Sequence, residues 1–139
     1  MADILVVDDE QAWRDLFTEL LESKGHTVRA VENGVLALGE IKRKRPELTI
    51  LDIRMSPSGR DLLRSIRRLM PDMPVVVCSS YGGYRDDPDF SKVDAYVVKS
   101  TDMDELLEAI DRTFALRRSH EKKKNYRDKP SPPCPAESS

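Results

Sequence analysis

The sequence has few cysteines and no long apolar run, and both absences narrow what the chain can be. No stretch of 18 apolar residues occurs and no apolar signal segment follows Met1, so we expect neither a membrane span nor secretion. Of the two cysteines, Cys78 lies in an apolar run and Cys134 in a polar tail, which argues against a disulfide and for a reducing compartment. We therefore expect a cytoplasmic protein.

Histidine is equally scarce, which bears on catalysis. The two histidines, His26 and His120, are not placed to activate a serine, so nothing supports acyl transfer. The loop after the first apolar run is Asp-Asp-Glu, and such an acidic loop would repel a flavin phosphate. A phosphatase of the haloacid type needs Asp-x-Asp, whereas Asp52 is followed by Ile53 and Arg54. A flavin-binding protein and a phosphatase are therefore poor interpretations.

What the chain does contain is typical of one soluble domain with a heavily charged surface. Hydrophobic residues make up 39% and charged residues 35% of the 139 residues. The net charge of −2 divides into +4 for residues 117–139 and −6 for the rest. A basic cluster around Arg117, Arg118 and Lys122 to Lys124 could contact nucleic acid or an acidic partner. A solvated helix end and tail explains the cluster more simply, so we expect no nucleic-acid partner for this domain. We divide the chain into a domain at 1–118 and a disordered, Pro/Ser-rich tail at 119–139.

Short apolar runs alternate with segments of helical periodicity along the domain. Apolar runs indicate strands covered on both faces at residues 4–7, 48–51, 75–78 and 95–98, and residues 27–31 (TVRAV) indicate a second, shorter strand. Apolar residues recur at helical spacing after the first, second, third and fifth runs; the first such segment contains Trp13 and Phe17, which are most simply core residues. The alternation predicts an α/β fold with a doubly wound, five-stranded parallel sheet and helices on both faces.

Helix boundaries can also be predicted. Gly25 is expected to end the first helix, and Asp102 with Glu105 three residues later resembles a capping arrangement. The stretch after the fourth strand has no clear apolar face and contains Gly82 and Pro88, which disfavour a helix interior by about 1 and about 3 kcal/mol. We therefore expect the fourth helix, near residues 82–92, to be short or irregular.

Four of the five predicted strands end in polar or ionisable groups: Asp8 and Asp9, Asp52, Ser79, and Lys99. The carboxyl ends of parallel strands meet at one edge of the sheet, where ligands bind in such folds. Three carboxylates brought together there repel one another and need a cation or protonation, and carboxylate oxygens suit Mg²⁺. A nearby ammonium and hydroxyl would serve a phosphoryl group. The pattern therefore favours phosphoryl transfer to a carboxylate.

These segments, in this order and spacing, resemble the receiver domains of response regulators. The resemblance covers residues 3 to about 116 and rests on Ile4–Glu10, Leu48–Met55, Pro74–Tyr81 and Ala95–Lys99. It implies a flavodoxin-like sheet with strand order 2-1-3-4-5. It also implies a phosphorylation-dependent signalling switch of a two-component system, a phosphoprotein that modifies itself rather than a turnover enzyme.

The resemblance assigns roles to the residues at the strand ends. Asp52 matches the phosphoacceptor, Asp9 the direct Mg²⁺ ligand and Asp8 an acid that acts largely through water. The backbone carbonyl of Arg54 matches the remaining metal ligand from the protein. Lys99 matches the lysine that pairs with the phosphoryl group.

Three further residues match the groups that respond to the phosphate. Ser79 corresponds to the hydroxyl residue that follows the phosphoryl group, and Tyr96 to the aromatic residue that turns inward with it. Ser80 holds a small-residue position whose backbone N–H can meet the phosphate.

The resemblance also implies partners. A sensor histidine kinase or phosphotransfer protein would supply the phosphoryl group, and a downstream target or a linked output domain would receive the signal; a homodimer is possible. The chain departs from the family's pattern in the loop with Pro57 and Gly59, in Ser100, and around residues 82–92. The last departure leaves open a receiver-like interaction scaffold whose switching is atypical or absent.

Overall fold

The computed structural model describes residues 2–54, 59–80, 93–100 and 103–128, with the side chains of the last segment described to residue 119. Within these residues five strands form one parallel sheet in the order β2-β1-β3-β4-β5, which confirms the predicted topology. The strands are β1 (Asp3–Val7), β2 (Thr27–Val31), β3 (Leu48–Leu51), β4 (Val75–Ser79) and β5 (Ala95–Val98), and the helices are α1 (Gln11–Ser23), α2 (Gly34–Arg43), α3 (Gly59–Leu69) and α4 (Asp104–Asp128).

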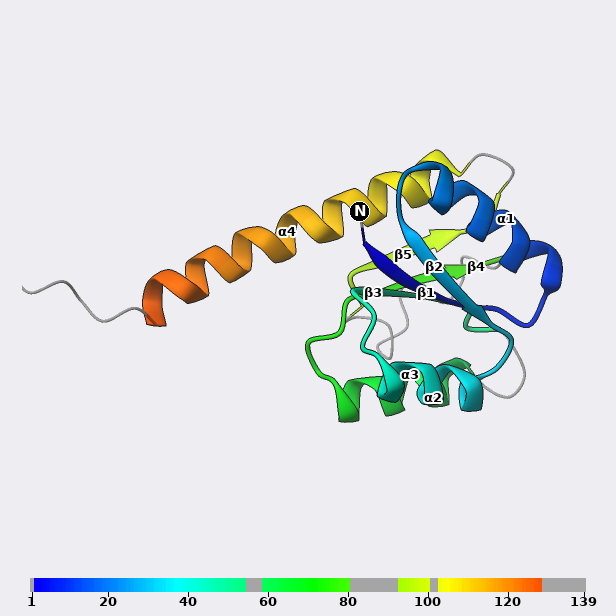
Figure 1. Ribbon diagram of the computed structural model, residues 1–139, viewed down its shortest axis with the longest axis horizontal. Coiled ribbons are helices and arrows are strands. Elements are labelled where there is room, and N and C mark those ends of the chain that lie inside the picture. The colour runs from blue at the N-terminus through cyan, green and yellow to red at the C-terminus, as the bar shows by residue number, and fades with distance from the viewer. Residues whose placement is uncertain (1, 55–58, 81–92, 101–102, 129–139) are drawn as a thin grey trace, which may run out of the picture.

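The central strands are apolar throughout because both faces of the sheet are covered. Alternate side chains of a strand point to opposite faces. Ile4 and Val6 of β1 pack in one buried cluster with residues of α1 and α4, including Phe17. Leu5 and Val7 pack in a second cluster with residues of α2 and α3. The result is a three-layer structure, with α1 and α4 on one face and α2 and α3 on the other (Figure 1).

Local signals set the ends of the first two helices. Gly25 has a φ of 91°, and the backbone N–H groups of Gly25 and His26 donate to the carbonyls of Glu22 and Leu21, so glycine ends α1 as predicted. The side chain of Asn33 accepts a hydrogen bond of 2.9 Å from the N–H of Leu36 and caps α2.

Helix α4 continues further than the sequence suggested. Its backbone is helical through Asp128, where we had expected disorder from residue 119, and its C-terminal part projects past the sheet (Figure 1). Charged residues are good helix formers, so a helix anchored on the core can extend through them. The domain boundary at residue 118 stays a prediction. The region around 82–92 and Asp102 lie outside the described residues.

A cluster of charged side chains fastens α4 to the edge of the sheet opposite the strand ends considered below. The guanidinium of Arg117 donates to both carboxylate oxygens of Asp94, at 3.0 and 3.2 Å, and to the carbonyl of Asp72 at 2.8 Å. The N–H of Val75, at the start of β4, donates to the same Asp94 carboxylate at 2.8 Å. Because Asp94 precedes β5, this cluster joins α4 to β4 and β5.

Candidate functional site

The parallel strands bring the predicted residues to one edge of the sheet. The N–H of Asp52 donates to the carbonyl of Val7 at 3.0 Å, and the N–H of Lys99 to the carbonyl of Ser79 at 2.8 Å. These bonds continue the ladders by one residue past β3 and β5, so Asp52 and Lys99 emerge beside their neighbouring strands. Asp8 continues β1 in the same way.

Lys99 joins two of the acids at the centre of this edge. Its Nζ lies 2.7 Å from Oδ2 of Asp8 and donates a hydrogen bond of 3.1 Å to Oδ2 of Asp52. The side chain of Lys99 is only 1% exposed, and those of Asp8 and Asp52 are 1% and 6% exposed. A third acid, Glu10, lies 3.9 Å from the same ammonium. The side chains of Asp52 and Lys99 therefore lie in contact at one edge of the sheet, as the sequence predicted.

Burial and ion pairing compete for the protonation of these groups. Burial removes the Asp8 carboxylate from water and raises its pKa, and the ion pair with Lys99 only partly offsets this. Burial alone would lower the pKa of Lys99, but its pairs with Asp8 and Asp52 outweigh burial and raise it. Lys99 is therefore a permanent cation at neutral pH. In β4, burial raises the pKa of the Cys78 thiol to about 12, so this thiol stays neutral.

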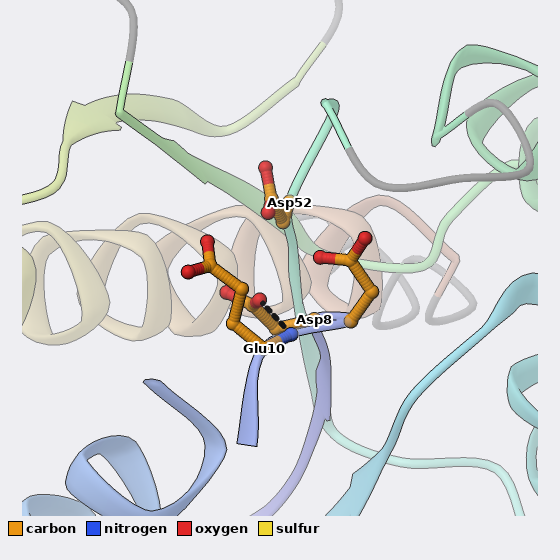
Figure 2. A group of neighbouring side chains, drawn as sticks. Asp8, Glu10 and Asp52 are labelled. Carbon is orange, nitrogen blue, oxygen red and sulfur yellow. Dashed lines mark hydrogen bonds between the residues drawn. The ribbon is translucent and has the colours of Figure 1, made fainter. Parts of the chain in front are cut away.

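Four acids form one group around this ammonium. Each of Asp8, Asp9, Glu10 and Asp52 offers a carboxylate oxygen, and these oxygens all lie within 4.8 Å of one another. Figure 2 shows three of them at the ends of β1 and β3, with the N–H of Glu10 donating to Oδ1 of Asp8 at 2.9 Å. A cavity of about 310 Å³ opens beside them and is lined by Asp9, Glu10, Asp52, Arg54 and Ser80. One lysine does not balance four carboxylates, so the group is suited to an additional cation.

The donor set fits Mg²⁺. Oδ2 of Asp8 is buried and pairs with the Lys99 ammonium at 2.7 Å, which leaves the second lone pair of this carboxylate oxygen without a hydrogen-bond donor among the described residues. That oxygen keeps lone-pair capacity for a cation or for water bound to one. Asp9 is exposed on the cavity wall, where a metal ion could keep part of its water shell. The N–H of Arg54 donates to Oδ1 of Asp52 at 3.0 Å, so the Arg54 backbone lies next to the acceptor carboxylate.

The remaining predicted residues lie at or near this edge. Ser79 is fully buried at the end of β4, and Ser80 is exposed on the cavity wall. Tyr96 is half-buried; it pairs in register with Val77 and packs against the cluster on the α2 and α3 face. The roles of these residues stay predictions.

Sequence reasoning gave no role to three residues that shape the site. Glu10 was seen only as part of the acidic run, although its place beside Asp9 was a usable signal. The apolar pattern predicts Trp13 as a core residue, yet its ring also lies under the Lys99 ammonium, 4.9 Å from Nζ. Gly59 was noted for its spacing alone, whereas an added Cβ there would stand 2.6 Å from the carbonyl oxygen of Asp52. Only the tertiary structure reveals the last two contacts.

Comparison with known proteins gives a consistent family. The family model described as the response regulator receiver domain matches residues 4–111. The nitrogen assimilation regulatory protein NtrX of Azorhizobium caulinodans is 36% identical over 124 residues, which are 84% of this chain and 27% of that protein. This chain spans about a quarter of the length of the first curated relatives it matches.

Solved structures agree in fold and sequence. The response regulator TrrA of Thermotoga maritima, in complex with Mg²⁺–BeF, superposes with a TM-score of 0.78 at 38% identity, covering 81% of this chain and 99% of that one. TrrA in complex with the histidine kinase ThkA gives a TM-score of 0.76, also at 38% identity, covering 81% and 98%. None of the helices in the described part of this chain has the length and apolarity that crossing a bilayer requires.

Proposed function

Because this chain belongs to the response regulator receiver family of two-component systems, we propose that it is a signalling switch that accepts a phosphoryl group on Asp52. One observation carries the proposal: the Asp52 carboxylate lies at the wall of an open, acid-lined cavity, and the buried Lys99 ammonium holds one of its oxygens at 3.1 Å. Although largely buried, this carboxylate lines the cavity from which a donor would approach, and its contact with Lys99 fixes its orientation.

The chemistry proposed is displacement at phosphorus. An oxygen of Asp52 attacks the phosphorus of a phosphohistidine, a P–O bond forms, and the P–N bond breaks as imidazole leaves with its electron pair. Lys99 orients the attacking carboxylate and then pairs with a phosphoryl oxygen, which lowers the cost of the charge brought into the site. Asp9, Asp52 and the Arg54 carbonyl would hold Mg²⁺, with Asp8 acting through water, and the ion would neutralise further carboxylate and phosphoryl charge.

The readout of the phosphate is assigned to β4 and β5. The Ser79 hydroxyl would donate to a phosphoryl oxygen, and so would the backbone N–H of Ser80, a residue that lines the cavity. Movement of Ser79 would free space on the sheet edge for Tyr96 of β5, and the aspartyl phosphate would thereby bias a two-state domain. Arg54, at the mouth of the same cavity, would affect the lifetime of the phosphate.

The partners follow from the family. The phosphodonor would be a sensor histidine kinase or a phosphotransfer protein; TrrA, similar to this chain, has been crystallised with a histidine kinase. The signal would pass to a downstream protein or to a linked output domain, since NtrX is much longer than this chain. Cytoplasmic location and homodimer formation stay predictions.

Phosphorylation by a small donor tests the proposal. We expect incubation with acetyl phosphate and Mg²⁺ to add a single acid-labile phosphate, measured by intact-protein mass, and to add none without Mg²⁺. Asp52→Asn removes the acceptor and should abolish the gain. Asp61→Asn makes the same change at an acid whose side chain is 75% exposed on α3, and should phosphorylate like the wild type. An unmodified wild-type chain would overturn the proposal and favour a scaffold.

A further inference from the structure

An aromatic ring forms part of the surroundings of the Lys99 ammonium. The Nζ of Lys99 lies over the ring of Trp13, 4.9 Å from its centroid. A cation within about 6 Å of an indole face is attracted by the negative face of the ring, and the attraction grows when water is excluded. Water is excluded here, because the side chain of Lys99 is only 1% exposed.

Trp13 is itself held in place relative to the acids. Its backbone N–H donates to the carbonyl of Glu10 at 3.1 Å, in the first turn of α1. The guanidinium of the next residue, Arg14, donates to the carbonyl of Asp8 at 2.7 Å. The indole also packs against Phe17, with ring centroids 5.6 Å apart. The turn of helix that carries the ring is therefore hydrogen-bonded directly to the acidic loop that follows β1.

The Trp13 ring differs from Asp8 and Asp52, two other partners of Lys99, because it neither ionises nor binds a metal ion. Asp8 and Asp52 attract the ammonium strongly, but both are also predicted to serve a metal ion, and Asp52 is the group to be modified. An indole neither titrates nor competes for a hard cation. It is thus the one contact of Lys99 among these three that stays unchanged when the acids acquire other partners.

From this geometry we infer that Trp13 is a positioning residue for Lys99: the indole face keeps the ammonium at the acceptor carboxylate while the acids bind metal and phosphate. The inference rests on the proposed function, since it concerns phosphoryl transfer to Asp52. Trp13 touches no reacting atom, so its effect passes through Lys99. A tryptophan that is only a core residue would affect folding stability and leave the reaction indifferent to the electrons of its ring.

The chain has a single tryptophan, so fluorinated tryptophan labels only this position. Mono-, di- and trifluorotryptophan weaken the negative ring face stepwise with little change in shape. We expect the logarithm of the initial rate of phosphorylation by acetyl phosphate to fall linearly along the series, by about five-fold in total. Mg²⁺ affinity, measured by calorimetry, should stay within about two-fold, because the metal ligands are untouched.

Two substitutions provide an independent comparison. Trp13→Phe keeps an aromatic face and should retain most of the rate, whereas Trp13→Leu keeps only apolar volume and should be slower by about ten-fold. The fluorinated series decides the matter if the leucine variant folds poorly. A flat series in a chain that is phosphorylated normally on Asp52 overturns the inference and leaves the proposed function standing. A wild-type chain that takes no phosphate overturns both.

Discussion

Replacing Gly59 by alanine would add one methyl group where the start of α3 meets the segment after β3. That methyl carbon would stand 2.6 Å from the carbonyl oxygen of Asp52 and 2.7 Å from Cα and the carbonyl oxygen of Ile53. Ordinary contact begins near 3.4 Å, so helix and segment must move apart by about 0.8 Å. These three neighbours are backbone atoms, which cannot rotate away as the end of a side chain could. Gly59→Ala therefore shifts the segment that carries Asp52.

The effect of Gly59→Ala on the free energy of unfolding can be estimated from two opposing contributions. Overpacking of this kind typically destabilises by about 1–3 kcal/mol, and alanine recovers at most about 1 kcal/mol of helix propensity. We expect a net loss of about 1–2 kcal/mol in the free energy of unfolding, measured by urea titration. Phosphorylation on Asp52 should slow as well, because the shift disturbs the position of the acceptor carboxylate relative to Lys99.

Gly39, in the middle of α2, is the matched control. An added Cβ there meets nothing within 4 Å, so Gly39→Ala should gain about 0.5–1 kcal/mol from helix propensity. The two alanine variants should therefore lie on opposite sides of the wild type. A Gly59→Ala chain as stable as Gly39→Ala, with an unchanged phosphorylation rate, would refute the reasoning.

Three more changes test the charges seen in the structure. Lys99→Met leaves Asp8 and Asp52 buried without their cation and should lower the free energy of unfolding by about 3–5 kcal/mol. In urea titrations, Mg²⁺ should stabilise this variant more than it stabilises the wild type. Burial lowers the pKa of His26 below 6.5, so the folded state resists protonation of this residue. The free energy of unfolding should therefore be full above about pH 6.5 and decrease as the pH falls below that value. The decrease, measured as urea midpoints at two pH values, should be smaller in His26→Gln. Arg117→Ala removes a partly exposed ion pair with Asp94 and should lower stability by about 1 kcal/mol, seen as a lower melting temperature. Arg118→Ala, on the exposed side of α4, should leave the melting temperature almost unchanged.

Each of these has an outcome that contradicts it. Equal Mg²⁺ stabilisation of Lys99→Met and the wild type would mean that the ion does not compensate the buried acids. A His26→Gln chain with the same pH dependence as the wild type would remove His26 from the acid response. If the Arg117 and Arg118 variants melt together, the Asp94 cluster does not secure α4.

Most of the fold could be predicted because the strands are covered on both faces. Runs such as Ile4–Val7 and Val75–Cys78 then have to be apolar throughout, and each ends where the chain leaves the core. The same rule located Asp52 and Lys99, since the first residue past a buried parallel strand lies at the ligand edge. The phosphoryl-transfer and Mg²⁺ predictions then followed from the chemistry of carboxylate and ammonium groups at that edge.

What could not be predicted depends on distances across the fold. The contact of Lys99 with Trp13 joins residues far apart in sequence, and nothing in a helical apolar stripe distinguishes a ring on the core from a ring under an ammonium. The close approach at Gly59 is set by how α3 packs, which spacing alone does not give. Helix α4 continued through a charged segment that composition favoured as disordered, because helix propensity and anchoring on the core outweighed the lack of an apolar face.

The most direct test of the central claim is to locate the phosphoryl group chemically. Borohydride reduces an aspartyl phosphate to homoserine, so a chain treated with acetyl phosphate and Mg²⁺, reduced and analysed by peptide mass spectrometry should carry homoserine at position 52 and nowhere else. Homoserine at Asp8 or Asp9, or its absence from a chain that has gained phosphate mass, would contradict the assignment of Asp52 as the phosphoacceptor.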